Sequence, residues 1–559
     1  MPHALTTKER YSTIALVLCT LMFGVAWIWM GYIERTNAIP AHGYTYTEAL
    51  VGEPQFINPI LLGLNDTNRD IASLVYSGLM KYNENGNVVP DLAERYEISE
   101  DGMSYTFFLR TDAEWHDGEK VTVDDVMFTF SAILNPEYGS PQRASLQEIK
   151  AEKIDNYTIR LTIPHPYAQF LERMTNGIVP KHVWENINPK NISLAEANLM
   201  PIGSGPYRFV KFAKDKYGRI VSLSLAANQR SYNGTPFIAA IDFFFYQTNE
   251  DALQAYKQKK VMGVSGIESQ QKGELEKYGA HVYAMNVPKY FAVFFNQTSN
   301  KALADKNVRI ALTHATDAMA ITRDVFDGNA TTIDSPVLPW FMGYNPDVKK
   351  YAPSIETAQA LLEESGWKDR DADGIREKTI GKDKEATPLA ITLITSDLPD
   401  LIYTGELLKA QWEAVGARVT FETYTIDELK QQVIKQRGYE ALLFGEALSQ
   451  LPDPYLFWHS SQRRDPGLNL ALYNNKDADA LLETMRESLS ADERTASVGK
   501  FQEILAEDVP AIFLYSPHYL YAVSNDVKNI ITTHINTPAR RFTAIEAWYI
   551  ATTRVNKEQ

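Results

Sequence analysis

A run of about 20 uncharged, mostly apolar residues near the N-terminus constrains this chain more than any other feature of its sequence. The run extends from Ile14 to Ile33 and reads IALVLCTLMFGVAWIWMGYI. At about 1.5 Å per residue, a helix of this length covers the roughly 30 Å hydrocarbon core of a bilayer. Trp27, Trp29 and Tyr32 lie toward its C-terminal end, and such amphipathic rings favour the headgroup level of a membrane. The sequence therefore predicts one transmembrane anchor over residues 14–33.

The charges on either side of this run predict its orientation. Lys8 and Arg10 precede it, whereas Glu34 and Arg35 cancel each other directly after it. Because positive residues are retained on the cytoplasmic side, we expect residues 1–13 to form a cytoplasmic tail. Residues 34–43 are then a linker, and the C-terminal bulk of this single-pass protein lies outside the cell membrane, extracellular or periplasmic.

Two alternatives to an uncleaved anchor remain open. A cleaved signal peptide has an apolar region of roughly 7–15 residues and a small-residue cleavage site, whereas this run is longer and ends in Met30-Gly31-Tyr32. A lipoprotein would use Cys19, but Leu18 precedes it where a small residue is required. In each of the three cases the body of the protein works outside the cytoplasm.

The length, charge and cysteine count of the chain limit the kinds of protein it can be. The chain has 559 residues, which is more than one hydrophobic core usually serves, so we expect two or three domains. Lys+Arg 55 against Asp+Glu 70 gives a net charge of -15. Such a surface repels phosphate backbones, and the sequence predicts no nucleic-acid partner. A single Cys excludes an intrachain disulfide framework and a Cys-based zinc site.

The body of the chain has the patterns of a mixed α/β protein. Its first half contains alternating apolar and polar segments that predict half-buried strands, at Tyr105–Leu109, Tyr157–Ile163, Val221–Leu225 and Ile241–Phe245. Asn85-Gly86 predicts a hairpin turn.

The second half predicts helices between strands. A strand at Leu389–Ile394, a helix at Pro399–Val415 and a strand at Val419–Tyr424 have the spacing of a βαβ unit in a parallel sheet. Two further helices are predicted from capping residues, over Lys306–Met319 and Ile355–Glu364.

The sequence contains none of the common catalytic signatures, neither a G-x-S-x-G elbow nor H-E-x-x-H nor a phosphate loop. Its nearest phosphate-loop resemblance is Gly203-Ser204-Gly205-Pro206. Pro206 lacks the backbone donor that a phosphate cradle needs, so a tight turn before a strand is the favoured interpretation. We therefore expect no enzyme activity and no cofactor.

One acidic run has the spacing of a calcium loop. Asp369, Asp371 and Asp373 stand at alternate positions before Gly374, and Glu377 fits the ninth position. The twelfth position, where a bidentate Glu closes the shell, is Ile380. Both a weak calcium site and a solvated acidic turn remain open, and the turn is favoured.

Several blocks of the chain, in the same order, resemble the extracellular solute-binding proteins of ABC importers, family 5, whose members bind oligopeptides, dipeptides and nickel. The longest is YEISEDGMSYTFFLRTDAEWHDGEKVTVDDVMFTFSAI, from Tyr96 to Ile133. Others are EPQFINPIL, SLVYSGLMKYNENGNVVPDLAERY, PIGSGPYRF, FFNQTSNKALADKNVRIALTHATD, LLEESGWKDRDADGI and LPDPYLFWHSS. The family also has an acidic loop at the place of residues 369–374, which supports the interpretation as an inherited turn.

This resemblance implies an α/β fold of two lobes, of the large periplasmic-binding-protein type with an extra subdomain. Lobe I would be discontinuous, over 44–84, 201–293 and 510–552, and its extra subdomain would be 85–200. Lobe II would be 294–509. The chain would cross between the lobes near Phe294–Asn296 and Ala511–Ser516, where hinge closure takes place.

The resemblance also implies a set of ligand-binding candidates. Tyrosine and tryptophan suit the walls of a peptide cleft, and the resemblance places Tyr455, Trp458, Tyr515 and Tyr519 at the lobe junction. Phe457 and Tyr521, in the same segments, are expected to be core residues.

The resemblance also implies a carboxylate that contacts the ligand. In peptide binders of the family, a carboxylate one turn upstream of the Asp-Pro pair holds the ligand's ammonium group. Aligning on Asp453-Pro454 puts the neutral Gln450 at that position, and Glu446 is the nearest upstream carboxylate. Asp453, Gln450 and Glu446 are therefore all candidates. Asn58 is a further candidate for a polar contact, with a turn-forming Asn before Pro59 as the alternative.

The implied function is that of a membrane-anchored substrate-binding protein that captures peptides, or similar oligomeric small solutes, in an interlobe cleft. Its partners would be the solute, ABC permease subunits and the membrane. The alternative is an extracellular sensor, receptor or assembly protein that uses the same fold without transport. The identity of the ligand is beyond what the sequence predicts, because one fold serves many ligands.

Overall fold

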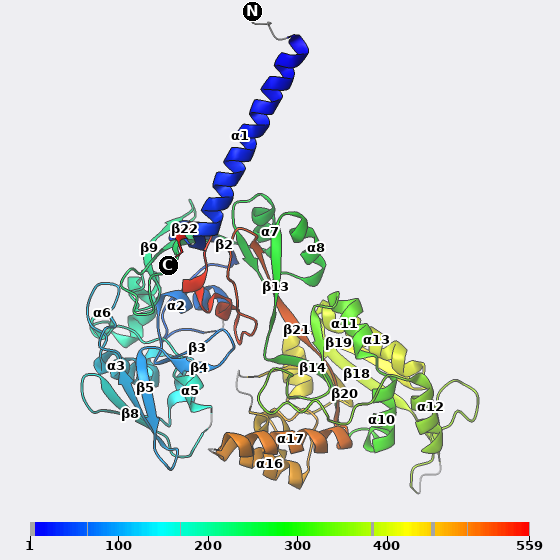
Figure 1. Cartoon of the computed structure of the whole chain (residues 1–559). Helices are drawn as coiled ribbons and strands as arrows, with labels where there is room; N and C mark the ends of the chain where they lie inside the picture. The colour runs from blue at the N-terminus through cyan, green and yellow to red at the C-terminus, as the bar shows by residue number, and fades with distance from the viewer. Residues whose placement is uncertain are drawn as a thin grey trace, which may run out of the picture.

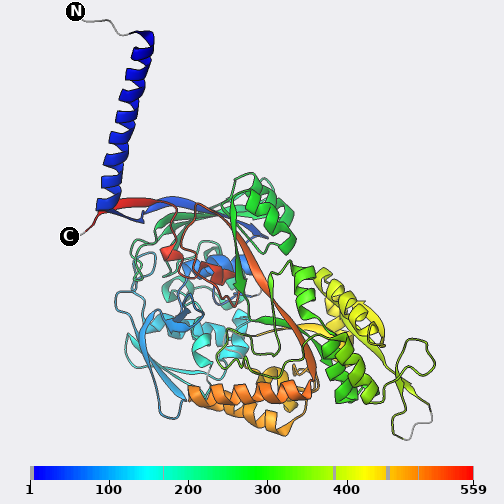
Figure 2. The ribbon, with the colours of Figure 1, turned by 45° about the vertical axis from the view of Figure 1, so that its right-hand side comes forward.

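The computed structural model describes residues 6–63, 65–167, 169–381, 385–448, 453–488 and 490–557. A long helix, α1 (Thr7–Arg35), projects from an α/β body that consists of two lobes (Figures 1 and 2). The fold class predicted from the sequence, a two-lobe α/β protein behind one apolar N-terminal helix, is confirmed.

Lobe I is built from segments that are far apart in the sequence. Its elements are β2 (Gly43–Val51), α2 (Asp66–Val75), β3 (Met80–Tyr82), β4 (Val88–Pro90), β9 (Tyr207–Lys214), β10 (Ile220–Ala227), β11 (Ile238–Tyr246), α7 (Asn249–Lys257), β12 (Gly263–Ser265), α8 (Ser269–Lys277), β13 (Ala280–Asn286), η6 (Pro538–Phe542) and η7 (Ile545–Ala547). A separate four-stranded sheet forms the subdomain attached to this lobe, in the order β5-β6-β8-β7. The elements of the subdomain include β5 (Ala93–Ile98), β6 (Ser104–Leu109), α3 (Val123–Leu134), α4 (Arg143–Leu146), β7 (Lys150–Lys153), β8 (Thr158–Thr162), α5 (Phe170–Arg173) and α6 (Lys181–Trp184).

Lobe II follows β13 in the chain. Its elements include β14 (Lys289–Phe295), α10 (Lys306–Ala315), α11 (Ala318–Phe326), β15 (Ala330–Thr332), α12 (Ile355–Glu364), β16 (Glu377–Lys378), β18 (Ala390–Ser396), α13 (Pro399–Glu413), β19 (Arg418–Tyr424), η4 (Leu429–Ile434), β20 (Ala441–Ala447), α15 (Tyr455–Trp458), α16 (Lys476–Glu487) and α17 (Ala491–Asp508). Two short strands, β1 (Thr36–Pro40) and β22 (Thr552–Asn556), form a separate antiparallel ribbon at the foot of α1.

One strand, β21 (Ala511–Ser524), runs through both lobes (Figure 2). Its first half pairs with β14 and β15, and its second half pairs with β12 and β13. The result is a continuous 12-stranded sheet. The second connection between the lobes is Val287-Pro288, between β13 and β14. The residue boundaries of the lobes given above stay a prediction.

Each lobe has its own apolar core. Two clusters of buried apolar side chains belong to lobe I and its subdomain, and two belong to lobe II. Along β21 the division falls between Tyr515, which packs in a lobe II cluster, and Tyr519, which packs in a lobe I cluster. The lobes are therefore separate packing units that share the strand β21.

Most of the predicted elements are present. The Asn85-Gly86 turn connects antiparallel β3 and β4, and the predicted βαβ unit is present as β18, α13 and β19, with β18 and β19 parallel. The predicted helix Lys306–Met319 is wrong in its length, because the chain forms α10 and α11 instead. The break occurs at Asp317, whose side chain accepts a hydrogen bond from the Ala320 amide and so begins a new helix.

The segment Gly203-Ser204-Gly205-Pro206 is the tight turn that its Pro predicts. It packs against the end of α2, and the Gly205 amide donates to the Val75 carbonyl at 2.8 Å. A Cβ atom on Gly203 would lie 1.9 Å from that carbonyl oxygen, so only glycine fits. The segment is a packing device that leads into β9.

A buried charge network holds lobe I together. Arg541, from η6, donates to Glu48 in β2 at 2.8 and 3.0 Å, and to Asp70 in α2 at 2.7 and 2.8 Å. The hydroxyls of Tyr521 and Tyr46 donate to the other oxygen of Glu48, the former at 2.6 Å. The side chains of the three charged residues are at most 3% exposed. Burial acts to lower the pKa of Arg541, but the carboxylates of Asp70 and Glu48 raise it well above its ordinary value, so the guanidinium stays charged.

We predict that Arg541→Met strongly destabilises lobe I, because it leaves two carboxylates buried without a cation. The free energy of unfolding should fall by about 3–5 kcal/mol, which chemical denaturation of the detergent-solubilised chain would measure. Arg219→Met is the matched control, since Arg219 pairs with Asp215 at 2.7 Å while its own side chain is 47% exposed. The control should change stability little. Equal effects of the two substitutions would contradict a stabilising role of the network.

Candidate functional site

Asp453 begins the short segment of lobe II that contains α15. Its side chain is buried, and its Oδ2 lies 3.2 Å from Nε of Arg486, which is on α16. Burial raises the pKa of Asp453, and the Arg486 guanidinium opposes that shift. An acidic side chain that is largely buried and has one cationic partner can still accept hydrogen bonds from a ligand.

Tyr455, two residues later, lies against the same arginine. Its ring stacks on the ring of His459 with centroids 4.1 Å apart, and the Arg486 guanidinium lies over it at 4.6 Å. Asp453, Tyr455 and Arg486 therefore form one contiguous group of a carboxylate, an aromatic ring and a guanidinium. We call this group the lobe II cluster.

The lobe II cluster lies close to the subdomain of lobe I. Burial raises the pKa of the Tyr167 phenol in the subdomain, and the negative charge of Asp453 adds to that rise. The guanidinium of Arg173, also in the subdomain, lies 4.6 Å from the centre of the Tyr167 ring. Charged and aromatic side chains of both lobes thus approach each other here, at the lobe junction.

Other contacts join the lobes nearer to the shared strand. The ring of Trp340 in lobe II lies 5.8 Å from that of His534 in lobe I, and His534 Nε2 is 3.2 Å from Asn286 Nδ2. Lys272 of α8 donates to Asn329 Oδ1 of lobe II at 3.2 Å. These contacts consist of polar and amphipathic side chains, and such groups can also contact a polar solute.

Glu446 is a buried carboxylate in β20, directly opposite Tyr290 of β14. The Tyr290 hydroxyl donates to Oε2 of Glu446, while Oε1 has no hydrogen-bond partner in the described part of the chain. Burial raises the pKa of Glu446 well above its ordinary value. The residue also lines a cavity of ≈ 450 Å³ together with Phe444, Phe457 and Leu470. Gln450, the other candidate in this region, lies outside the described residues.

The remaining aromatic candidates are placed in or near the cores. Trp458 is buried against Phe294 and Phe513, and Tyr515 is buried with its hydroxyl 3.1 Å from Thr404 Oγ1. Tyr519 is half-buried in the part of β21 that belongs to lobe I. Phe457 and Tyr521 are buried, as expected of core residues. A ligand role for Trp458, Tyr515 and Tyr519 stays a prediction.

Asn58 is fully buried and forms a local turn. Its Oδ1 accepts from the Ile60 amide at 2.9 Å, and its Nδ2 donates to Asn198 Oδ1 at 3.2 Å. Both ends of the amide therefore already have protein partners, which favours the alternative of a turn-forming Asn.

The acidic run forms an exposed turn. One oxygen each from Asp369, Asp371 and Asp373 lies within 4.8 Å of the others. Asp369 accepts from the Gly374 amide at 3.0 Å, and Asp373 accepts from the Ile375 amide at 2.8 Å. Glu377 accepts from the Arg370 amide at 3.1 Å instead of joining the three aspartates. The carboxylates thus already have the partners of a turn, and calcium binding stays a prediction.

Sequence reasoning missed Arg486, Tyr167, Arg173, His534 and Trp340 as parts of the lobe junction. None of them lies in a segment that carried the resemblance to a known site. Their positions depend on how α16, the subdomain and the C-terminal segment pack. The one local signal was the helical spacing of Arg486, which comes four residues after the buried Leu482 in α16.

Comparison with known proteins places this chain in a family. The profile described as "Bacterial extracellular solute-binding proteins, family 5 Middle" matches residues 87–466. The oligopeptide-binding protein AppA of Bacillus subtilis is 28% identical over 534 residues, which cover 93% of this chain and 94% of AppA. The dipeptide-binding protein of Escherichia coli is 25% identical over 91% of this chain and 96% of its own length.

Solved structures agree with the sequence comparison. The structure of Bacillus subtilis AppA in complex with a nonapeptide is similar with a TM-score of 0.65 and 26% identity, over 92% of this chain and 100% of that one. The structure of NikZ from Campylobacter jejuni in complex with Ni(L-His) has a TM-score of 0.67 and 26% identity, over 90% of this chain and 99% of NikZ. AppA and the Escherichia coli protein are both named as peptide-binding proteins. The chain, as its sequence blocks predicted, belongs to family 5 of the bacterial extracellular solute-binding proteins.

Proposed function

We propose that this protein is the membrane-anchored substrate-binding subunit of an ABC importer, and that it captures peptides, or similar oligomeric small solutes, between its lobes. The observation that carries the proposal is the approach of the lobe II cluster, Asp453, Tyr455 and Arg486, to Tyr167 and Arg173 of lobe I. A peptide has charged ends and a polar backbone, which such carboxylate, guanidinium and phenol groups can contact.

The arrangement of the strands supports capture by hinge closure. The lobes have separate cores and are joined through β21 and through Val287-Pro288, so a rotation about these segments leaves both cores intact. Contacts that a ligand makes with both lobes at once would stabilise the closed state, because only differential contacts shift such an equilibrium.

Asp453 is the proposed acceptor for the ammonium group of a peptide. It lies at the lobe junction, whereas Glu446 is already bonded to Tyr290 and burial favours its neutral form. Gln450 is neutral at every pH, and a neutral acceptor holds an ammonium group more weakly than a carboxylate does.

The substitution Asp453→Asn tests this assignment. We expect it to lower the affinity for a peptide with a free N-terminus about tenfold or more, since a hydrogen bond to a charged group contributes roughly 1.5–3 kcal/mol. The N-acetylated form of the same peptide should bind both proteins alike. The peptide is chosen by mass spectrometry from material that co-purifies with the chain, and its affinity is measured by calorimetry.

Two variants control for charge. Asp371→Asn removes a carboxylate from the exposed turn and should leave the affinity unchanged. If Glu446→Gln alone weakened binding of the free peptide, Glu446 and not Asp453 would be the acceptor. A single defined ligand in place of a peptide series, with no permease or ATPase gene beside this one, would favour the sensor or receptor alternative.

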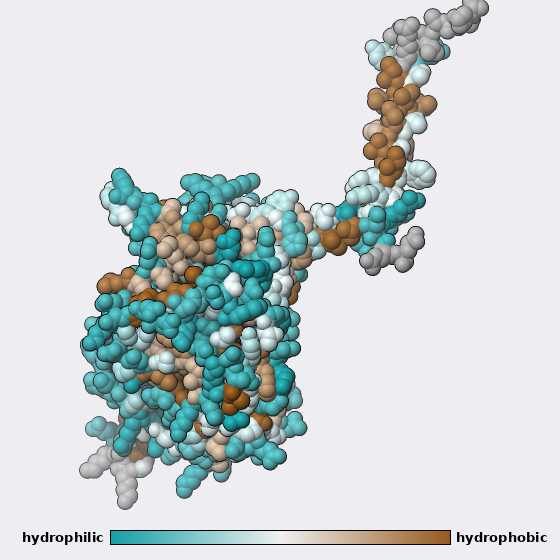
Figure 3. Space-filling model, turned by 90° about the vertical axis from the view of Figure 1, so that its left-hand side faces the viewer, coloured by the Kyte–Doolittle hydropathy of each residue, from teal (hydrophilic) through white to brown (hydrophobic). Residues whose placement is uncertain are grey.

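The N-terminal helix supports the anchoring part of the proposal. Residues Tyr11–Arg35 are long and apolar enough to cross a bilayer, and none of that segment is buried against the body. Apolar side chains cover the helix, while the face of the body in the same view is mostly polar (Figure 3). The same properties fit a signal sequence. The contacts at the C-terminal end of α1 distinguish better between a retained helix and a cleaved one.

The foot of α1 is bound by the C-terminal strand. Thr36–Pro40 pairs with Thr552–Asn556. Arg554 donates to Thr36 Oγ1 at 2.7 Å and to the carbonyls of Ile33 and Thr36 at 3.0 Å, and it lies 5.7 Å from the Tyr32 ring. Its contacts thus reach back into the last turn of α1, which supports a mature protein that retains the helix.

We predict that the mature protein keeps residues 11–35. Its intact mass should include them, and the protein should stay in the membrane fraction after a carbonate wash, because a helix of this length inserts stably. A variant that lacks residues 1–35 should be released. A mature N-terminus located beyond Ile33 would contradict the anchor and favour a cleaved signal peptide.

A further inference from the structure

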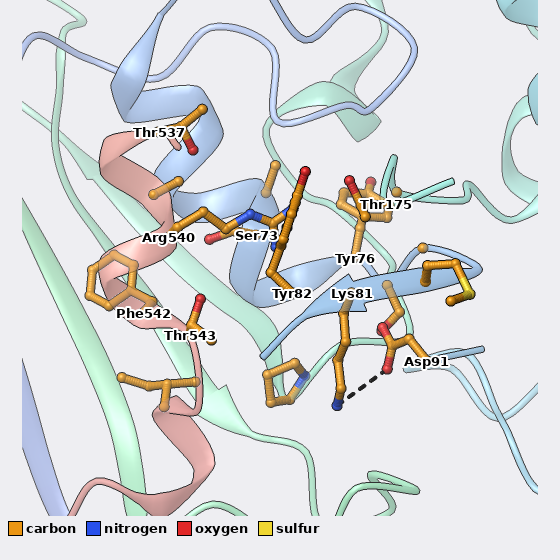
Figure 4. Close-up of a pocket in the computed structure, with 18 of the residues that line it drawn as sticks. Ser73, Tyr76, Lys81, Tyr82, Asp91, Thr175, Thr537, Arg540, Phe542 and Thr543 are labelled. Atoms are coloured by element: carbon orange, nitrogen blue, oxygen red, sulfur yellow. Dashed lines mark ion pairs between the residues drawn. The ribbon is translucent and has the colours of Figure 1, made fainter. Parts of the chain in front are cut away.

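Lobe I contains a cavity that is distinct from the lobe junction. It has a volume of ≈ 620 Å³, within the range of roughly 300–1,000 Å³ that small-molecule sites occupy. Its walls are α2, β3, the segment Thr175–Gly177, and η6 with η7 (Figure 4). All its lining residues belong to lobe I and its subdomain, and none belongs to the lobe II cluster.

Three cationic side chains line this cavity, and two of them have carboxylate partners. Arg69 lies 3.9 Å from Asp66, and Lys81 lies 3.5 Å from Asp91 (Figure 4). Arg540 instead lies over the ring of Tyr82, at 4.6 Å. Its side chain has neither an ion pair nor a hydrogen bond within the described residues.

Arg540 is thus a half-buried cation with free donors. Burial lowers its pKa, and the nearby Tyr82 phenol and the carboxyl groups of Asp91 and Glu172 oppose that shift. Its Cζ atom lies over the Tyr82 ring, and its N–H groups have no hydrogen-bond partner within the described residues. A guanidinium edge matches a carboxylate with two parallel hydrogen bonds.

Neutral polar groups of the same cavity also have free hydrogen-bonding atoms. Tyr76 is only 6% exposed, and its buried hydroxyl has no hydrogen-bond partner among the described residues. Asn536 Oδ1 is likewise without a partner there. A buried hydroxyl without a partner costs free energy, so a cavity that contains one is suited to a polar ligand.

The acidic residues of the cavity restrict the charge of that ligand. Asp91 already interacts with Lys81, Tyr232 and Asn233, and Glu84 and Glu546 are two further acidic residues in the lining. These carboxylates repel a dianion such as phosphate, whereas one Arg540 guanidinium balances a single negative charge.

We infer that this lobe I cavity is a second ligand site, which binds a small monocarboxylate with its carboxylate on Arg540 and a further polar group on Tyr76. The site does not depend on peptide capture at the lobe junction, because it shares no lining residue with the lobe II cluster. It gives lobe I a ligand of its own.

Calorimetry with two small probes tests the site on the full chain in detergent. N-acetyl-L-alanine carries a carboxylate and no ammonium group, and L-alaninamide carries the reverse. We expect saturable binding of N-acetyl-L-alanine and none of L-alaninamide. Arg540→Gln should lower the affinity for N-acetyl-L-alanine at least tenfold. Arg69→Gln is the control, because it changes a cavity arginine that is already paired, and it should leave that affinity unchanged.

Hydrogen exchange locates the bound probe. N-acetyl-L-alanine should slow exchange in Pro538–Ala547 and Met80–Tyr82, and this slowing should be absent in Arg540→Gln. Arg540→Lys keeps the charge without the planar edge, and we expect intermediate affinity from it. Thermal unfolding checks that each variant is folded. Absence of saturable binding, equal affinity in Arg540→Gln, or protection confined to residues 453–458 would overturn the inference.

Discussion

The ion network of Arg541, Glu48 and Asp70 is the interaction on which the architecture depends. Glu48 lies in the first long strand of the body, and Arg541 lies after the last strand of the large sheet. The chain builds all of lobe II between these two residues, so the network forms only when the C-terminal segment has returned to lobe I. The segment also packs Phe542, Ile545 and Trp548 into the lobe I core, and the buried guanidinium among them needs its two carboxylates.

Because lobe I is closed by its own contacts, lobe II does not have to hold it together. The apolar clusters do not cross between the lobes, and the contacts at the junction are polar or amphipathic. Such contacts exchange with water or with a ligand at low cost, while a shared apolar core would resist opening. This division between rigid lobes and a polar junction is what a binding protein that closes on a solute requires.

Local patterns in the sequence predicted local structure well. Ile355–Glu364 forms the expected helix, because its Ser354 cap and apolar spacing act within a few residues. The break at Asp317 was missed, since the same residue type fits a helix interior or a cap until tertiary packing decides. The site shows the same limit: Asp453 and Tyr455 are neighbours in the sequence, but Arg486 and Tyr167 reach them only through the folded arrangement of α16 and the subdomain. The cavity around Arg540 has no sequence signature, because its walls come from segments that are far apart in the chain.

The ribbon of β1 and β22 determines which lobe is linked to the N-terminal helix α1. Arg554 bonds to the last turn of α1 and lies in the strand that follows lobe I, so the helix and lobe I form one connected unit. Within the described residues, lobe II is joined to that unit through β21, Val287-Pro288 and the junction contacts. If the proposed anchor holds α1 in a bilayer, lobe I is the lobe tethered to the membrane by the β1–β22 ribbon, and the proposed closure moves lobe II relative to it.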